Sequence, residues 1–254
     1  MLSILPHRIN SLFFYLTNLS PTGRVIGATV AKHNQYETPG QVQIRINTPE
    51  QQTLVDSLRN NDLTVVIGPA GTGKTFLSLA IALQMLNEKR LDKILVVRRI
   101  TPTFGEDLGA LPGDLLEKFA PFAGGVLDNL SQLIGRPLLM QYLAEGKLEF
   151  IPVSWCRGRT FVRTFVLVDE VQQMNPEMLL CILTRFGRGS KMVLAGDPQQ
   201  ADHGHLGGIE YAKYIATGVK SAAVIQFSNQ HIERHPIVRQ VLQRSQSWIT
   251  PLSE

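Results

Sequence analysis

The stretch IGPAGTGKTFLSLA, residues 67–80, places a glycine-rich turn between a short apolar run and an apolar helical pattern. Gly68 to Thr75 fits the pattern G-x-x-x-x-G-K-[ST], in which glycines let backbone N–H groups turn inward around an anion. The helix that begins near Lys74 directs the positive end of its dipole at the same place. The sequence therefore predicts a loop that binds the phosphates of a nucleotide.

The residues of this loop have distinct expected roles. Lys74 should reach the β and γ phosphates, and the Thr75 hydroxyl should bind Mg²⁺. The residues expected to bind the nucleotide are Gly68, Pro69, Ala70, Gly71, Thr72, Gly73, Lys74, Thr75 and Phe76.

Short apolar runs alternate with helical patterns along the rest of the chain. Such alternation is typical of an α/β fold with a doubly wound parallel sheet, so we expect a single RecA-like P-loop NTPase domain. Thr48 is an expected helix cap before Pro49, and Asn175 is another. The expected strands are 63–67, 94–97, 165–168, 192–195 and 222–227, with 148–153 as a weaker candidate and 41–45 as a short edge strand; the expected helices include 75–89, 176–185 and 236–245.

Composition limits the class of protein. With 44% hydrophobic and 18% charged residues, the chain can build a sizeable core. We expect an N-terminal arm over 1–46, the ATPase domain over 47–245 and a tail over 246–254. Cys156 and Cys181 are too few for a disulfide framework, so we expect buried free thiols in a reducing cytoplasm. The apolar run 12–16 is far shorter than a membrane span, and we expect no membrane association.

The run 165–170, FVLVDE, ends in two carboxylates. Asp169, at the end of the expected strand, is placed to hold Mg²⁺. Glu170 can deprotonate a water for attack on the γ-phosphate, which favours hydrolysis over transfer to a substrate. The alternative is that Glu170 is a loop carboxylate that faces solvent.

A third run, 192–195, is followed by GDPQQAD. In ATPases with a catalytic glutamate, an extra strand lies between the phosphate-loop strand and the strand of the two carboxylates, and a polar residue after it senses the γ-phosphate. Gln200 or Asp197 can take that role, and a neutral amide positions water without adding charge. The alternative is a plain Asp-Pro turn.

Taken in order, these motifs resemble the PhoH-like ATPase family, whose core is similar to the nucleotide-binding domain of superfamily 1 helicases. The resemblance covers roughly residues 47–242 and rests on TPEQ, ILVVRR with GALPGDLLEKFAPF, CRGRT, VDEVQQMNPE, LTRFGRGSKMVLAGDPQQAD and ERHPIV. It implies that Gln51 reads the adenine edge, and hence ATP, and that Arg234 contacts phosphate, in some relatives from a neighbouring subunit. Other positions that match the family's motifs are Arg99, Gly113, Arg157, Arg159, Gln200 and Asp202. The chain departs from the family's pattern at Ile100, Val171, Gln173 and His231.

Three uses of the ATP stay open. The first is helicase-like remodelling of RNA or single-stranded nucleic acid, for which one such domain would need a homo-oligomeric ring, such as a hexamer, with Arg234 or Arg188 acting across the subunit boundary. The mild net charge of +4 is compatible with this partner. Trp155, Arg157, Arg159 and Phe161 could form a basic aromatic surface for it, or the aromatic could pack on the core with the arginines serving the nucleotide.

The second use is an ATP-gated regulatory or assembly protein that acts on a protein partner. The third is a metal-dependent nuclease with ligands among Asp202, His203, His205 and His231. The catalytic residues expected for ATP hydrolysis are Lys74, Glu170, Gln200 and Arg234, and the expected magnesium ligands are Thr75 and Asp169.

Overall fold

The computed structural model describes residues 42–100, 115–201 and 207–228, together with Ile237, Gln240 and Arg244, and the side chains of 123–201 within the second range. All statements on the fold concern these residues. Of the expected helix over 236–245, only the three single residues are described, and each is helical. Most of the expected arm and all of the expected tail lie outside the described residues.

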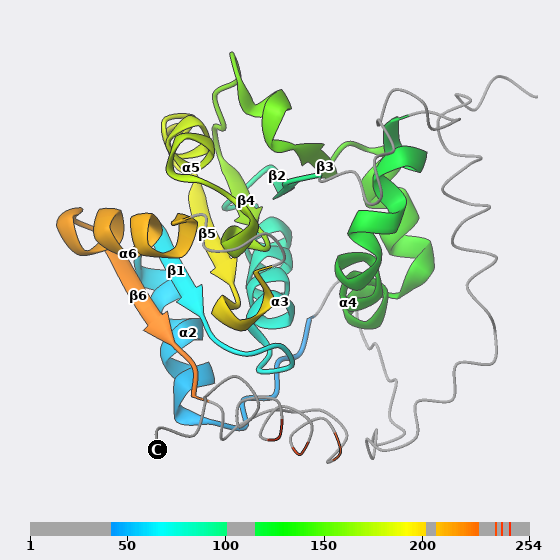
Figure 1. The fold of residues 1–254 in the computed structure, drawn as a ribbon. Coiled ribbons are helices and arrows are strands. Elements are labelled where there is room, and N and C mark those ends of the chain that lie inside the picture. Colours follow the sequence, from blue (N-terminus) through cyan, green and yellow to red (C-terminus); the bar gives the residue numbers. More distant parts are fainter. Residues whose placement is uncertain are drawn as a thin grey trace, which may run out of the picture.

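Six strands form one parallel sheet in the order β3-β2-β4-β5-β1-β6 (Figure 1). Each of the six expected runs over 63–227 forms a strand, and β5 lies between β1 and β4 as expected for an ATPase of this type. The strands are β1 Leu63–Ile67, β2 Lys93–Arg98, β3 Leu148–Pro152, β4 Thr164–Val168, β5 Lys191–Gly196 and β6 Ala222–Gln226.

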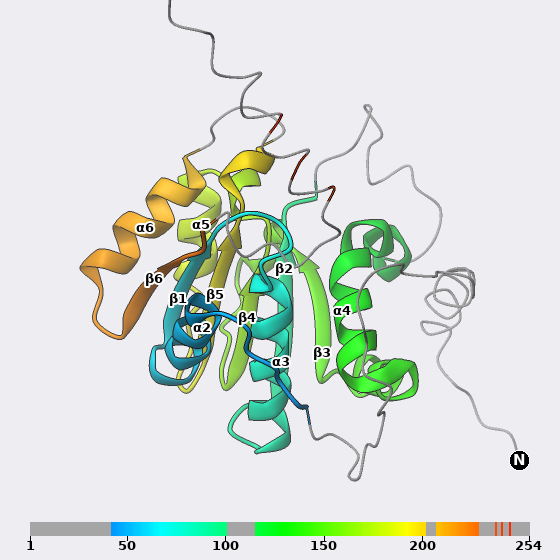
Figure 2. The same cartoon turned by 90° about the horizontal axis from the view of Figure 1, so that it is seen from below.

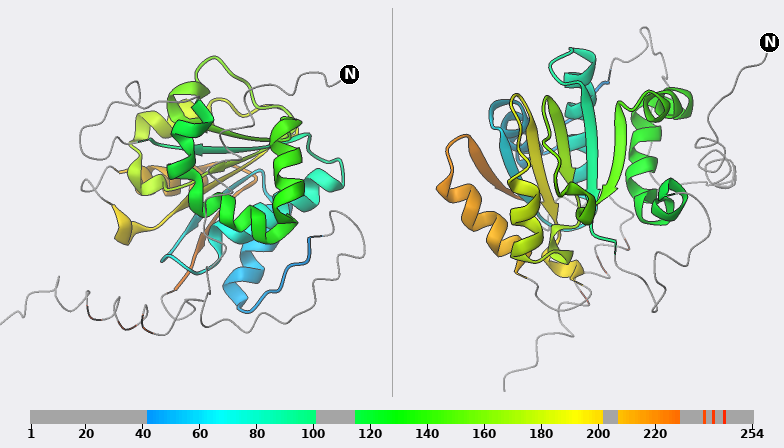
Figure 3. Two further views of the ribbon diagram at one scale, coloured as in Figure 1. Left: turned by 90° about the vertical axis from the view of Figure 1, so that its right-hand side faces the viewer. Right: turned by 90° about the horizontal axis from the view of Figure 1, so that it is seen from above.

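Helices cover both faces of this sheet (Figures 2 and 3), which confirms the doubly wound α/β fold. Buried residues of α2, α3 and α4 share one apolar cluster with one face of the strands, and those of α5 and α6 share a second cluster with the other face. The helices are α2 Pro49–Asn60, α3 Lys74–Asn87, α4 Leu115–Ala144, α5 Pro176–Leu183 and α6 Gly208–Gly218, with short 3₁₀ turns η2 Val153–Cys156, η3 Val171–Gln173 and η4 Pro198–Gln200.

The strands are apolar without a break because both of their faces are covered. Val66 and Val96 pack toward α3, whereas Leu95 and Val97 pack toward the opposite layer, and all four side chains are buried. This burial fixes the sheet in the middle of the molecule. The carboxyl ends of its strands consequently gather at one edge, where the loops that follow them meet.

Side-chain caps fix where two of the helices begin. Thr48 Oγ1 accepts a hydrogen bond from the Gln51 N–H at 3.2 Å at the start of α2. Asn175 Oδ1 accepts one from the Met178 N–H at 2.9 Å at the start of α5. Both caps were expected from the sequence, since these residue types satisfy N–H groups that lack a partner within the helix.

The expected edge strand over 41–45 is wrong for its described part. Residues 42–47 form no strand. Instead, Val42 is buried against the α3 layer, and its carbonyl accepts a hydrogen bond from Gln84 Nε2 at 2.9 Å. The side-chain alternation in QVQIR therefore reflects packing against a helix rather than pairing with a sheet edge. Within the described ranges, no helix is long and apolar enough to span a membrane.

Candidate nucleotide-binding site

The glycine-rich loop joins β1 to α3 and is held tightly against the neighbouring strands. A Cβ built on Gly68 would lie 2.6 Å from the Phe227 Cβ, so only glycine fits the close approach of this loop to the end of β6. Gly73, at the start of α3, has a φ of 91°, in the left-handed region that favours glycine. The backbone conformation of the loop therefore needs glycine at both Gly68 and Gly73.

Lys74 is buried within this loop. Its Nζ donates hydrogen bonds to the carbonyl oxygens of Gly68 at 2.6 Å and of Pro69 at 2.7 Å. The Thr72 hydroxyl donates to the same Pro69 carbonyl at 2.9 Å, and Thr72 is also buried. The ammonium group is thus held inside the curve of the loop, on the side where a phosphate would lie.

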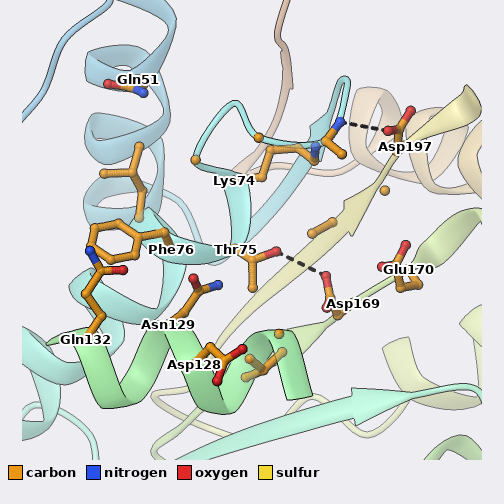
Figure 4. Close-up of a pocket in the computed structure, with 18 of the residues that line it drawn as sticks. Gln51, Lys74, Thr75, Phe76, Asp128, Asn129, Gln132, Asp169, Glu170 and Asp197 are labelled. Atoms are coloured by element: carbon orange, nitrogen blue, oxygen red, sulfur yellow. Dashed lines mark hydrogen bonds between the residues drawn. The ribbon is translucent and has the colours of Figure 1, made fainter. Parts of the chain in front are cut away.

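A cavity of about 890 Å³ opens beside the loop at the carboxyl edge of the sheet (Figure 4). Its volume lies in the range of small-molecule sites, roughly 300–1,000 Å³. Eleven residues expected at the site line it, whereas Gly68, Pro69 and Thr72 complete the loop behind it. The eleven are Gln51, Ala70, Gly71, Gly73, Lys74, Thr75, Phe76, Asp169, Glu170, Asp197 and Gln200.

Thr75 and Asp169 meet where the loop comes closest to β4. The Thr75 hydroxyl donates to Asp169 Oδ1 at 3.2 Å (Figure 4). Burial raises the pKa of the Asp169 carboxyl, an effect that Arg98 opposes and Glu170 increases. A hydroxyl and a carboxylate are hard oxygen donors of the kind that Mg²⁺ binds, so this pair fits the ion that the sequence predicts there.

Glu170 follows β4 directly and lines the cavity. Its backbone is left-handed, with φ 59° and ψ 47°, and its Oε1 accepts a hydrogen bond from Arg98 Nη2 at 2.9 Å. Its Oε2 accepts a hydrogen bond from Gln172 Nε2. This half-buried, paired group differs from the solvent-facing loop carboxylate that was the alternative interpretation.

The segment after β5 contacts the loop through Asp197 rather than through Gln200. Asp197 is buried, and its Oδ2 accepts a hydrogen bond from the Ala70 N–H at 2.8 Å (Figure 4). Gln200 is exposed and lines the cavity, and its carbonyl accepts a hydrogen bond from Gln173 Nε2 at 2.7 Å. The sequence left these two residues open as candidates for one role, and the structure gives them different positions.

Comparison with known proteins assigns the family. A family model described as PhoH-like protein matches residues 43–246. The chain belongs to the PhoH-like protein family.

Two relatives show how much of this PhoH-like protein is shared. The PhoH-like protein of Synechocystis sp. is 36% identical over 202 residues, which cover 79% of this chain and 61% of the relative. The PhoH-like protein of Bacillus subtilis is also 36% identical, over 79% of this chain and 63% of the relative. The chain therefore spans about three fifths of the length of these relatives.

Among solved structures, the large terminase from a thermophilic bacteriophage has a similar fold. The TM-score is 0.50 at 13% identity, over 82% of this chain and 52% of the terminase chain. Together with the family, this likeness shows that the chain has the fold of the P-loop ATPases.

Gln51, expected at the adenine, is almost fully buried in this PhoH-like protein. Its Nε2 donates to the Thr72 carbonyl at 3.3 Å, and its Oε1 accepts a hydrogen bond from the Asn47 N–H at 2.8 Å. It thus joins the start of α2 to the phosphate loop and lines the cavity at the same time. The role of its amide in reading adenine stays a prediction.

Three groups of polar cavity residues were missed from the sequence, the third being Gln43, Arg45 and Asn47 before α2. The first is Arg98 at the end of β2, because the family resemblance directed attention to Arg99, which donates instead to the Gln173 carbonyl at 2.6 Å. The second is one face of α4, which lies across the cavity from Thr75 and Phe76 (Figure 4). Helical spacing with polar side chains was the available signal for this face, which comprises Gly125, Asp128, Asn129 and Gln132.

In the segment 155–161 some side chains are exposed to solvent and others are bound within the protein. Trp155 is 51% exposed, so it does not pack on the core as the alternative interpretation had it. Arg159 binds Glu149 with both of its Nη atoms, at 2.8 and 3.0 Å, toward the amino end of β3, and its guanidinium lies over the Phe161 ring. Arg159 therefore serves neither the nucleotide nor an open surface, whereas Arg157 is exposed.

The remaining expectations have different outcomes. Arg188 lies before β5, and its carbonyl accepts a hydrogen bond from the Arg163 N–H at 3.0 Å, at the opposite edge of the sheet from the phosphate loop. Cys156 is buried as expected, but Cys181 is only half-buried. The described part of the chain holds no group of three or more His, Cys, Asp or Glu side chains that could bind a metal. Arg234, Gly113, Asp202, His203, His205 and His231 lie outside the described residues.

Proposed function

We propose that this PhoH-like protein hydrolyses ATP with Mg²⁺ and couples the reaction to RNA or another single-stranded nucleic acid. The observation that carries the first half is the convergence of Lys74, Thr75, Asp169 and Glu170 on one cavity. A loop cation, two oxygen donors for a hard cation and a carboxylate base are the parts that γ-phosphate hydrolysis needs.

In this mechanism a water oxygen bonds to the γ-phosphorus while the bond from that phosphorus to the β–γ bridging oxygen breaks. ADP leaves, and Glu170 takes the proton of the attacking water. Lys74 and the loop amides stabilise the charge that develops on the phosphate oxygens, and Gln200 positions the water. Thr75 and Asp169 would hold Mg²⁺, which would supply positive charge beside the phosphates.

The test is steady-state ATP hydrolysis by matched carboxylate variants. Glu170→Gln should lower kcat by about 10²–10⁴-fold, the usual contribution of a general base, while ATP binding is retained. Glu88→Gln is the control, because Glu88 follows α3 at the end remote from the phosphate loop and its exposed carboxylate forms an ion pair with Arg90 at 3.5 Å. Equal kcat values for the two variants would remove Glu170 from the mechanism.

Coupling to nucleic acid has a candidate surface at the same edge of the sheet. Trp155 and Arg157 follow the carboxyl end of β3 and are exposed. An exposed aromatic beside a cation is the usual platform for single-stranded bases, which stack on the ring while the cation meets the phosphates. The second half of the proposal therefore rests on these two residues.

Stimulation of hydrolysis by single-stranded RNA tests this coupling. Trp155→Ala should weaken RNA binding by about 1–3 kcal/mol, the cost of losing one stacked base. Tyr214→Ala, which removes an aromatic side chain that is 74% exposed on α6, should not change it. If RNA stimulates neither the wild-type protein nor the control, a protein partner becomes the better hypothesis.

Assembly into a homo-oligomeric ring is part of the proposal, with Arg234 contacting phosphates across a subunit boundary as the family resemblance implies. Light scattering with and without ATP gives the number of subunits. A mixture of Arg234→Ala and Glu170→Gln chains should regain hydrolysis if the arginine acts on the neighbour's site. A monomer under all conditions would contradict this part alone.

A further inference from the structure

Both carboxylate oxygens of Glu170 are engaged. Oε1 forms an ion pair with Arg98 Nη2 at 2.9 Å, and Oε2 accepts a hydrogen bond from Gln172 Nε2. A general base needs an oxygen that can accept the proton of the attacking water. In this structure, therefore, Glu170 is paired with protein groups on the two atoms that the proposed hydrolysis would use.

The pairing of β2 with β4 places Arg98 where it can bind the carboxylate of Glu170. Val97 is the register partner of Val168, so Arg98 lies beside the two carboxylates that follow β4. Its Nε is 3.8 Å from Asp169 Oδ2, and its side chain is only 19% exposed. One planar guanidinium thus faces both acidic groups from within the cavity, an arrangement that arginine can make because its donors form a rigid fork.

A chain of hydrogen bonds connects the same glutamate to the phosphate loop. Gln172 Oε1 accepts a hydrogen bond from the Asp197 N–H at 3.0 Å, and Asp197 Oδ2 accepts one from the Ala70 N–H at 2.8 Å. Gln172 and Asp197 are both buried. The Ala70 N–H belongs to the loop that should bind phosphate, and here a carboxylate occupies it. Gln172 thus binds the backbone of Asp197, and the side chain of Asp197 binds the loop, so the surroundings of Glu170 and the phosphate loop are fixed together.

The backbone of Glu170 is consistent with a restrained state. A left-handed conformation is disfavoured for a residue with a Cβ and persists where the surroundings hold it. The Gln173 N–H donates to the Glu170 carbonyl at 2.9 Å, and the two side-chain contacts hold the other end of the residue. Such strained positions are typical of elements that change state.

We propose that Arg98 is a positioning residue that holds Glu170 away from the attacking water, so that only part of the protein has this carboxylate free to act as base. This inference rests on the proposed ATP hydrolysis with Glu170 as base. It goes beyond that function because it assigns a basal restraint to a residue that the proposed chemistry does not use.

The test combines hydrolysis with nucleotide binding in Arg98→Gln and Arg98→Lys. Arg98→Gln removes the ion pair and should raise basal kcat by about fivefold. This is the change in the share of unpaired Glu170 that the strongest exposed ion pairs would cause. Arg98→Lys keeps a cation beside Glu170 and should give an intermediate kcat. The Kd for a fluorescent ADP, measured without Mg²⁺, should stay within about twofold of wild type in both variants, since one partly buried pair is removed outside the phosphate loop.

The outcomes separate the two proposals. A wild-type protein that hydrolyses ATP, with an Arg98→Gln variant whose kcat is equal or lower at unchanged ADP affinity, overturns the restraint and leaves the hydrolysis proposal standing. A large rise in the Kd for ADP also overturns it, because Arg98 would then support the fold of the loop. Absence of hydrolysis in every chain overturns the proposed function and this inference with it.

Discussion

Replacing Gly68 with alanine tests whether the phosphate loop depends on its close packing against the end of β6. A Cβ on Gly68 lies 2.6 Å from the Phe227 Cβ and 3.1 Å from the Phe227 carbonyl oxygen. Carbon atoms pack best at about 3.5–4.0 Å, so the loop and Phe227 must separate by roughly 1 Å. Phe227 is buried, and its N–H donates to the Ile67 carbonyl at 2.8 Å, so this movement also strains the pairing of β6 with β1.

The expected cost follows from this overlap. Adding a methyl group to a tightly packed site costs about 1–3 kcal/mol. Each kcal/mol lowers the melting temperature of a domain of this size by about 2–4 °C. We therefore expect Gly68→Ala to melt roughly 4–8 °C below the wild type for a cost near the middle of that range. The Kd for ATP should rise as well, because the loop amides move.

Thermal unfolding and nucleotide titration measure both effects, with Gly218→Ala as the matched control. A Cβ on Gly218 meets no atom within 4 Å, and Gly218 is the last residue of α6. Alanine should therefore leave this site unchanged or stabilise it by up to about 1 kcal/mol. If Gly68→Ala melts and binds ATP like the wild type, the close approach of the loop to Phe227 does not constrain the site, and the reasoning is refuted.

Three further predictions concern the rest of the molecule. The hydrogen bond from Arg159 is the main cause that lowers the pKa of Glu149, so this pair stabilises the fold at pH values above the pKa that Glu149 has in the unfolded chain. Glu149→Gln should therefore lower the free energy of unfolding by about 1 kcal/mol at pH 7. The difference from wild type in urea unfolding should shrink below about pH 4. Burial raises the pKa of Cys156 to about 12, so iodoacetamide at pH 8 should label the folded chain at Cys181 alone and label both thiols in denaturant, as mass spectrometry would show. Asn175→Ala removes the cap of α5 and should lower the free energy of unfolding by about 1 kcal/mol, and an unchanged urea midpoint would contradict the role of the cap.

The sequence was sufficient for those parts of the fold that local patterns determine. A parallel strand covered on both faces needs an unbroken apolar run, and each such run over 63–227 is a strand. The caps at Thr48 and Asn175 were readable because capping depends on one side chain and its immediate neighbours. The phosphate loop was readable for the same reason.

The cavity was less predictable because it depends on contacts between distant segments. Arg98 and Arg99 are adjacent, and only the register of β2 against β4 decides which of them reaches Glu170. The lining face of α4 depends on how that helix packs beside α3, which its own periodicity does not specify. The alternation over 41–45 predicted an edge strand, whereas Val42 packs against the α3 layer and its carbonyl is bound by Gln84, a contact that the local pattern does not specify.

The hydrogen bonds of Lys74 hold the phosphate loop in shape from within. Lys74 is only 8% exposed, and burying its ammonium group is costly unless acceptors surround it. The Gly68 and Pro69 carbonyls, at 2.6 and 2.7 Å, are such acceptors, and they belong to the loop itself. Lys74 thus holds two carbonyls of the loop close to its ammonium group, and the Asp197 carboxylate binds the Ala70 N–H of the same loop. These contacts hold the loop in one conformation, which lowers the conformational entropy that the binding of a phosphate there would have to overcome.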